Sequence, residues 1–184
     1  TPSPLANLQI ETQDGALKQL GAWDTEKYIN IWVVQEICSN TDGCAVAGYA
    51  SAPWMHGEQR DGIVVEAFVL SGSTDLIKLL VHEMGHYLGL LHTFEGGCDN
   101  GDCLADGDRV CDTPPDNSVG VSPCGTATNS CQSDVNPADG NNPFTTEQQD
   151  LENNYMDYSY LPCQTAFTSG QVARMMAMLE LRIS

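Results

Sequence analysis

The chain has 184 residues, a length that fits one domain with a hydrophobic core. It carries 25 acidic residues against seven Lys and Arg, for a net charge of −18. This charge makes nucleic acid and anionic membranes poor partners. Such an excess of acids suits an extracellular protein that binds cations, although solubility alone explains much of it.

The eight cysteines form an even set and contain no C-x-x-C pair, so they do not match a zinc ribbon. Disulfides formed in an oxidising compartment are the better interpretation. The sequence shows no signal peptide and no apolar run long enough to cross a membrane. We therefore expect the mature form of a secreted protein.

The first half of the chain predicts several short strands. Residues 8–12 alternate and form a possible first strand, and residues 28–35 are rich in β-branched and aromatic side chains. Cys38 and Cys44 flank a turn-forming stretch and are expected to pair, with a free buried pair as the alternative. Two further strands are predicted at 46–53 and 62–70, and His56 between them is given no role.

A buried helix is predicted over residues 76–88, after a turn in which Ser73 or Thr74 can cap it. His82 and His86 are four residues apart, so they share a helix face and can reach one metal ion. Glu83 can touch a water on that metal without being a ligand. Gly89 allows the chain to turn, so that His92 returns as a third ligand. Three imidazoles and one open position describe a catalytic zinc site.

The extended pattern H-E-x-x-H-x-x-G-x-x-H is the zinc signature of the metzincin metallopeptidases. The segment N-N-Y-M-D-Y-S at 153–159 resembles the methionine turn of that clan, with Met156 beneath the metal. The residues Thr93-Phe94, Gly96-Gly97-Cys98 and Asp112-Thr113-Pro114 resemble the pappalysin (cytophagalysin) family. The resemblance extends from about residue 23 to residue 176.

This resemblance implies an α+β metzincin-like fold, with a twisted mixed sheet, a buried active-site helix and a loop-rich C-terminal half that ends in a helix. We expect one catalytic domain, with the sheet and active-site helix in 1–92 and the loops in 93–184. Residues 95–154 lack hydrophobic periodicity, and a loop of this length needs cross-links to stay compact. A capping box at Thr168 to Gln171 opens the final helix. By the family pattern Cys98 pairs with Cys131 and Cys124 with Cys163, which leaves Cys103 and Cys111 to close a small loop.

The resemblance also implies roles for particular residues. Family members bind calcium near G-D-x-V-x-D-T-P, and acids in a flexible loop suit that ion, although a solvated acidic loop is the alternative. Tyr158 is expected to lean on the metal or the oxyanion, or else only to pack. The edge strand at 46–53 is expected to bind an extended peptide. The possible calcium ligands are Asp106, Asp108, Val110, Asp112 and Thr113, and the expected substrate-binding residues are Gly48, Tyr49, Ala50, Ser51, Tyr160 and Leu161.

The sequence therefore predicts a secreted zinc endopeptidase that cleaves proteins or peptides, with a zinc-bound water as nucleophile and Glu83 as general base and then acid. Pappalysins that cut before Arg or Lys carry acids just after M-D-Y-S, whereas here Tyr160 and Leu161 follow Ser159. We therefore expect an apolar residue after the scissile bond. The alternatives are an inert binding module on the same fold and a calcium-stabilised structural protein. The oligomeric state stays open.

Overall fold

A computed structural model describes residues 5–117, 123–126 and 128–183, and its contacts divide the chain into two compact units. The first unit runs to Gly89 and takes in the chain again from Ala177, and the second unit runs from Leu90 to Met176. This division falls three residues before the boundary expected after His92. No helix in the described part of the chain is both long and apolar enough to span a membrane.

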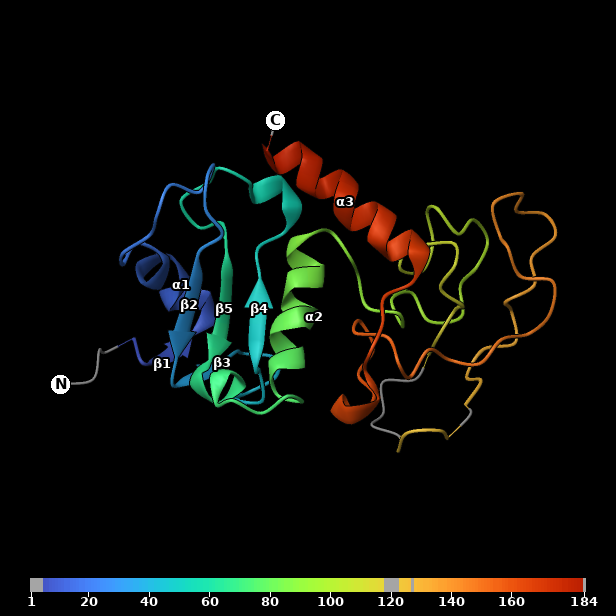
Figure 1. Ribbon diagram of the computed structural model, residues 1–184, viewed down its shortest axis with the longest axis horizontal. Coiled ribbons are helices and arrows are strands. Elements are labelled where there is room, and N and C mark those ends of the chain that lie inside the picture. Colours follow the sequence, from blue (N-terminus) through green and yellow to red (C-terminus); the bar gives the residue numbers. More distant parts are fainter. Residues whose placement is uncertain (1–4, 118–122, 127, 184) are drawn as a thin grey trace. The chain divides into compact units, whose positions relative to one another are not determined.

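The first unit is built on a three-stranded mixed sheet, with strand order β2-β5-β4 (Figure 1). Strand β2 (Ile31–Val34) runs parallel to β5 (Ile63–Glu66), and β4 (Gly48–Ala50) runs antiparallel to β5. A second, two-stranded parallel sheet joins β1 (Asn7–Gln9) to β3 (Glu36–Cys38). In the described residues β4 pairs with β5 alone, so its other edge is free.

Apolar side chains cover both faces of this sheet. On one face α1 (Ile10–Lys18) contributes Leu17 to a core cluster that also contains Leu8, Trp32, Val34, Ile37 and Val64. On the other face α2 (Ile77–Tyr87) contributes Tyr87 to a cluster with Ile63, Val65 and Val69. The alternation of Ile63, Val64 and Val65 between the two clusters is that of a strand buried on both sides.

The elements differ from the sequence prediction mainly at their ends. The strands predicted at 28–35, 46–53 and 62–70 exist, but each is shorter, and residues 67–70 form a 3₁₀ turn. The expected first strand at 8–12 is wrong in part, because the helix α1 begins at Ile10. Gln13 explains this end, since its Oε1 accepts a hydrogen bond from the N–H of Gln9 at 2.7 Å and so favours a helical turn. The predicted helix 76–88 agrees with α2 to within one residue at each end.

The second unit has almost no regular structure before its last helix. Its described residues from 93 to 160 form turns and irregular loops, as the missing periodicity predicted. The helix α3 (Ser169–Ile183) begins here and continues into the first unit. Its capping box is present, because Gln171 N–H donates to Thr168 Oγ1 at 3.1 Å and Thr168 N–H donates to Gln171 Oε1 at 2.9 Å.

Four disulfides tie the loops together: Cys38–Cys44, Cys98–Cys131, Cys103–Cys111 and Cys124–Cys163. These are the pairings that the sequence analysis expected. Three of them lie in the second unit, where a packed core of helices and strands is absent from the described residues. Cross-links that close loops in the unfolded chain compensate for this missing core.

Candidate metal centre

Helix α2 presents His82 and His86 on one face, one turn apart. Their Nε2 atoms lie 3.0 Å from each other, and the two ring planes are nearly perpendicular. Two nitrogens that each lie 2.0–2.1 Å from a tetrahedral zinc are separated by about 3.3 Å. The two rings are therefore placed as two ligands of one small cation would be.

His92 completes the set within the continuous segment 82–92. One ligand atom from each of His82, His86 and His92 falls within 4.8 Å of the others. Three neutral imidazoles suit zinc, and no fourth protein ligand joins them among the described residues. Glu36 with Cys38 and Cys44 forms another group of possible ligands, but both sulfurs are used in a disulfide.

The end of α2 shows how the chain turns between its second and third histidines. Gly89 has φ of +87°, and its N–H donates to the carbonyl of His86 at 2.9 Å. A Cβ at this position would lie 2.9 Å from Cγ of Met178, so both the backbone angle and the space require glycine. The same end is anchored by Arg182, which donates to the Tyr87 carbonyl and to Asp61.

Glu83 lies on α2 between the two histidines and against strand β4. It is buried, and burial raises the pKa of its carboxyl group to about 8. A Cβ built on Gly48 would lie 3.0 Å from Cγ of Glu83. Glycine at the start of β4 therefore leaves the room that the Glu83 side chain occupies.

His92 is held by aromatic rings of the second unit. The ring of Phe94 stacks on it in parallel, with centroids 4.7 Å apart and planes 8° apart. Tyr158 meets His92 edge-on at 4.7 Å and contacts Phe94 at 4.9 Å. This contact of Phe94 could not be predicted from the sequence, because residue spacing does not show which face of the His92 ring is covered.

The methionine turn is tethered to the residue that follows the third histidine. Met156 is fully buried, and its carbonyl accepts the Thr93 N–H at 3.2 Å. Its own N–H donates to Asn154 Oδ1, and the Asn154 amide exchanges hydrogen bonds with Gln171 of α3. The turn is thus fixed by hydrogen bonds to both sides. After it, Tyr160 is exposed and Leu161 opens a 3₁₀ turn that ends at Cys163.

A cavity of about 20 Å³ lies in the acidic loops of the second unit. Asp108 lines it and is 5% exposed, and its Oδ2 atom has no hydrogen-bond partner. Its Oδ1 atom accepts from the Val110 N–H and the Thr113 hydroxyl, yet burial still raises the pKa of this carboxyl to about 7. The hydroxyl of Thr93, also on the wall, is a second buried oxygen without a partner. These oxygens fit a cation or a water.

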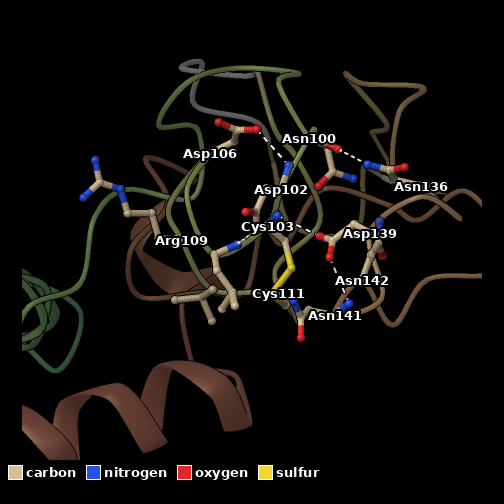
Figure 2. Close-up of a disulfide and its surroundings, with 12 residues drawn as sticks. Asn100, Asp102, Cys103, Asp106, Arg109, Cys111, Asn136, Asp139, Asn141 and Asn142 are labelled. Atoms are coloured by element: carbon tan, nitrogen blue, oxygen red, sulfur yellow. Dashed lines mark hydrogen bonds between the residues drawn. A yellow bond between two sulfur atoms is a disulfide. The ribbon is translucent and has the colours of Figure 1, made fainter.

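Of the other expected calcium ligands, Asp106, Val110 and Thr113 also line this cavity, and Asp112 does not. Asp112 instead accepts hydrogen bonds from Thr168 Oγ1 and Gly170 N–H at the start of α3. Figure 2 shows the Asp106 carboxylate accepting the Asp102 N–H beside the Cys103–Cys111 disulfide. In the same view Asp139 accepts the Cys103 N–H, so two carboxylates fix the backbone at the Cys103 end of that disulfide.

These features agree with a comparison to known protein families. The model of the peptidase M43 family, described as pregnancy-associated plasma protein-A, matches residues 12–180. The chain belongs to the pappalysin family. The family match covers β4, α2 and the methionine turn, so the three histidines, Glu83 and Met156 all lie inside it.

The relatives include proteins named as extracellular metalloproteases. An extracellular metalloprotease of Neurospora crassa is 32% identical over 177 residues, which is 92% of this chain and 54% of that protein. Extracellular metalloprotease 1 of Coccidioides posadasii is 40% identical over 123 residues, which is 65% of this chain and 38% of that protein. The chain thus spans about half the length of these curated relatives, or less.

Solved structures show the same pappalysin fold. Mature mirolysin of Tannerella forsythia, in complex with a cleaved peptide, matches with a TM-score of 0.65 and 25% identity over 97% of this chain and 65% of that one. Mirolysin in complex with another compound matches with a TM-score of 0.64 and 26% identity, over 95% of this chain and 62% of that one. The mixed sheet with helices α2 and α3 is therefore a metzincin fold.

Proposed function

We propose that this pappalysin is a secreted, zinc-dependent endopeptidase. The single observation that carries the proposal is the convergence of His82, His86 and His92 beside a buried, intact Glu83. An inert binding module on the same fold has no need of the carboxylate. The four disulfides fit an oxidising, extracellular compartment, as do the names of the relatives.

The three histidines would hold the zinc, which when bound supplies Lewis acidity toward water and toward the scissile carbonyl. The Glu83 carboxylate takes the proton from the attacking water at one of its Oε atoms. It then delivers that proton to the amine nitrogen as the peptide C–N bond breaks. Tyr158, whose ring lies against His92, donates a hydrogen bond toward the developing negative charge on the carbonyl oxygen.

The substrate is expected to lie along the free edge of β4. Its backbone N–H and C=O groups would pair with those of Gly48, Tyr49, Ala50 and Ser51, as an added strand. Tyr160 and Leu161 would form the wall for the residue after the scissile bond, where an apolar side chain fits better than an uncompensated cation. Mass spectrometry of a digested proteome tests this preference, and cuts clustered before Arg or Lys would refute it.

We also propose a structural calcium ion in the second unit, with Asp108 as its main ligand. The Asp108 Oδ2 atom is buried without a partner and faces a cavity of ionic size, lined also by Asp99 and Asp106. Burying a carboxylate is costly unless a cation or donor compensates it. Asp112 is better explained as the cap of α3, while Thr113 and Val110 hold Asp108 itself. Calorimetric titration of calcium into the wild type and into the Asp108→Asn variant tests this assignment.

A cleavage assay on casein or gelatin tests the activity. The wild type should cleave, lose activity with a zinc chelator and regain it when zinc is restored. Glu83→Ala should bind zinc and cleave nothing. If the wild type cleaves no protein while it and the variant bind the same partners, the binding-module alternative is correct.

A further inference from the structure

A second cavity lies beside β4 in the first unit, with a volume of about 410 Å³. Its walls come from α1, from the residues that follow Tyr49, and from Arg60. We propose that it is a subsite for an acidic side chain of the substrate, at a position before the scissile bond. This inference rests on the proposed endopeptidase function and adds a substrate preference to it.

The side chains of β4 show which sheet face the cavity occupies. Gly48 faces α2, because a Cβ there would meet Glu83. Tyr49 points the opposite way, and its hydroxyl donates to Asp14 of α1 at 2.6 Å. A peptide added to the edge of β4 alternates in the same manner. Every second substrate side chain therefore points to the α1 face, where the cavity lies.

The position of Glu83 sets the direction along the strand. Glu83 contacts the first residue of β4, Gly48, whereas the cavity borders the chain from Tyr49 to Ala52. We take the added peptide strand to run antiparallel to β4, so that its amino-terminal residues lie over the later residues of β4. The cavity therefore receives a substrate residue that precedes the bond being cut.

The charged groups around this cavity other than Arg60 have ionic or hydrogen-bonding partners. Lys18 is buried and forms an ion pair with Asp14 at 3.1 Å, and it lies 3.3 Å from Ser51 Oγ. Asp14 also accepts the Tyr49 hydroxyl. Glu11 accepts hydrogen bonds from the Asn40 N–H and from the Gln9 amide, which hold the pKa of its carboxyl below its ordinary value.

Besides Glu11, whose partners are neutral, Arg60 is the charged side chain of this wall without an ion pair among the described residues. Arg60 is also exposed. In a chain with 25 acids and seven basic residues, four of those seven pair with an aspartate. An uncompensated guanidinium beside a cavity favours a carboxylate as its occupant.

The test compares peptides that differ only at this position. A proteome-derived peptide library identifies the cut sites of the wild type, and fluorogenic peptides then carry Glu, Gln or Lys at the enriched position. We expect Glu to exceed Gln in kcat/KM by about twofold to fivefold, a difference that shrinks at high salt. Arg60→Gln should abolish the difference, and Arg60→Glu should reverse it toward Lys. Lys27→Glu changes the net charge by the same amount away from the cavity, and should keep the wild-type profile.

A binding measurement separates this inference from the proposed function. Fluorescence anisotropy with Glu83→Gln compares a labelled glutamate-rich peptide pool with its lysine-rich counterpart. Tighter binding of the acidic pool, reversed by Arg60→Glu, supports the subsite even if the wild type cleaves nothing. Cleavage without any acidic preference, or a preference that Arg60→Glu leaves unchanged, overturns the subsite and leaves the protease assignment intact.

Discussion

Glu83 is the residue on which the proposed chemistry depends most. Replacing it with glutamine keeps the size of the side chain and removes the proton acceptor. We expect Glu83→Gln to lower kcat by about 10²- to 10⁴-fold, since general base catalysis contributes that much. Zinc content, measured by elemental analysis, should stay at the wild-type level, because Glu83 is not among the three ligands. A variant that keeps its activity would remove Glu83 from the mechanism.

Phe94 is expected to position His92 through the stacked contact of their rings. Phe94→Leu removes an aromatic pair worth about 0.5–1.5 kcal/mol, so zinc affinity should fall about twofold to tenfold. Competition with a chromogenic chelator measures this. Phe94→Tyr keeps the ring and should restore affinity, while Phe167→Leu, which disrupts the separate Tyr155–Phe167 pair, is a matched control. Equal affinity in all four proteins would show that the stacking is incidental.

Asp157 makes stability depend on pH. Burial and the nearby charge of Asp116 raise the pKa of its carboxyl to about 6, above the ordinary 3.8. The fold therefore favours the protonated form, and the free energy of unfolding falls as pH rises from about 4 to about 6. Asp157→Asn should remove this slope, so its stability relative to the wild type should increase over that range and level off above it. Urea unfolding at several pH values measures the difference, and a constant difference would contradict the assignment.

Among single residues, the three converging histidines, Glu83 and Gly89 could be singled out from the sequence, because a fixed helical spacing and a glycine turn place them. Phe94, Asp14 and Arg60 could not. Their contacts join residues that are distant in sequence or depend on the face of a ring. The orphaned oxygen of Asp108 also needed coordinates, since several acids in the same loop looked equivalent.

Helix α3 depends on an aspartate that lies far away in sequence. Asp112 accepts hydrogen bonds from Thr168 Oγ1 at 2.7 Å and from Gly170 N–H at 2.8 Å, and so caps the helix. Asp112→Ala should lower the free energy of unfolding by about 1–2 kcal/mol, and Asp112→Asn by less. Chemical unfolding measures both. Calcium affinity should change little if Asp112 caps the helix. A loss of calcium binding without a loss of stability would show instead that Asp112 is a calcium ligand.

At the level of elements, the sequence predicted which strands and helices exist better than it predicted where each one begins and ends. The patterns for β2, β5 and α2 were strong because buried runs of apolar residues carry them. The alternation at 8–12 was misleading, because Ile10 to Thr12 lie in a helix whose start involves the side chain of Gln13. The strand propensity of five residues carries no information about such a hydrogen bond from a neighbouring side chain.

Across the whole molecule, the two units are stabilised in different ways. The first has two apolar clusters on a sheet, whereas the second relies on three disulfides that close segments of 33, 8 and 39 residues. Each such cross-link contributes about 2–4 kcal/mol. Mild reduction should therefore expose the loops between 93 and 160 to trypsin or thermolysin before it exposes residues 31–87. Mass spectrometry of the first fragments measures this, and earlier cleavage in the first unit would contradict it.

The central claim is that three imidazoles hold one catalytic zinc ion. Elemental analysis of the purified protein after gel filtration tests it most directly, with His92→Ala as the matched variant. The account predicts one zinc per chain in the wild type and substantially less in His92→Ala under equal free zinc. A wild type without a tightly held transition metal, or a variant that keeps the full amount, would contradict it.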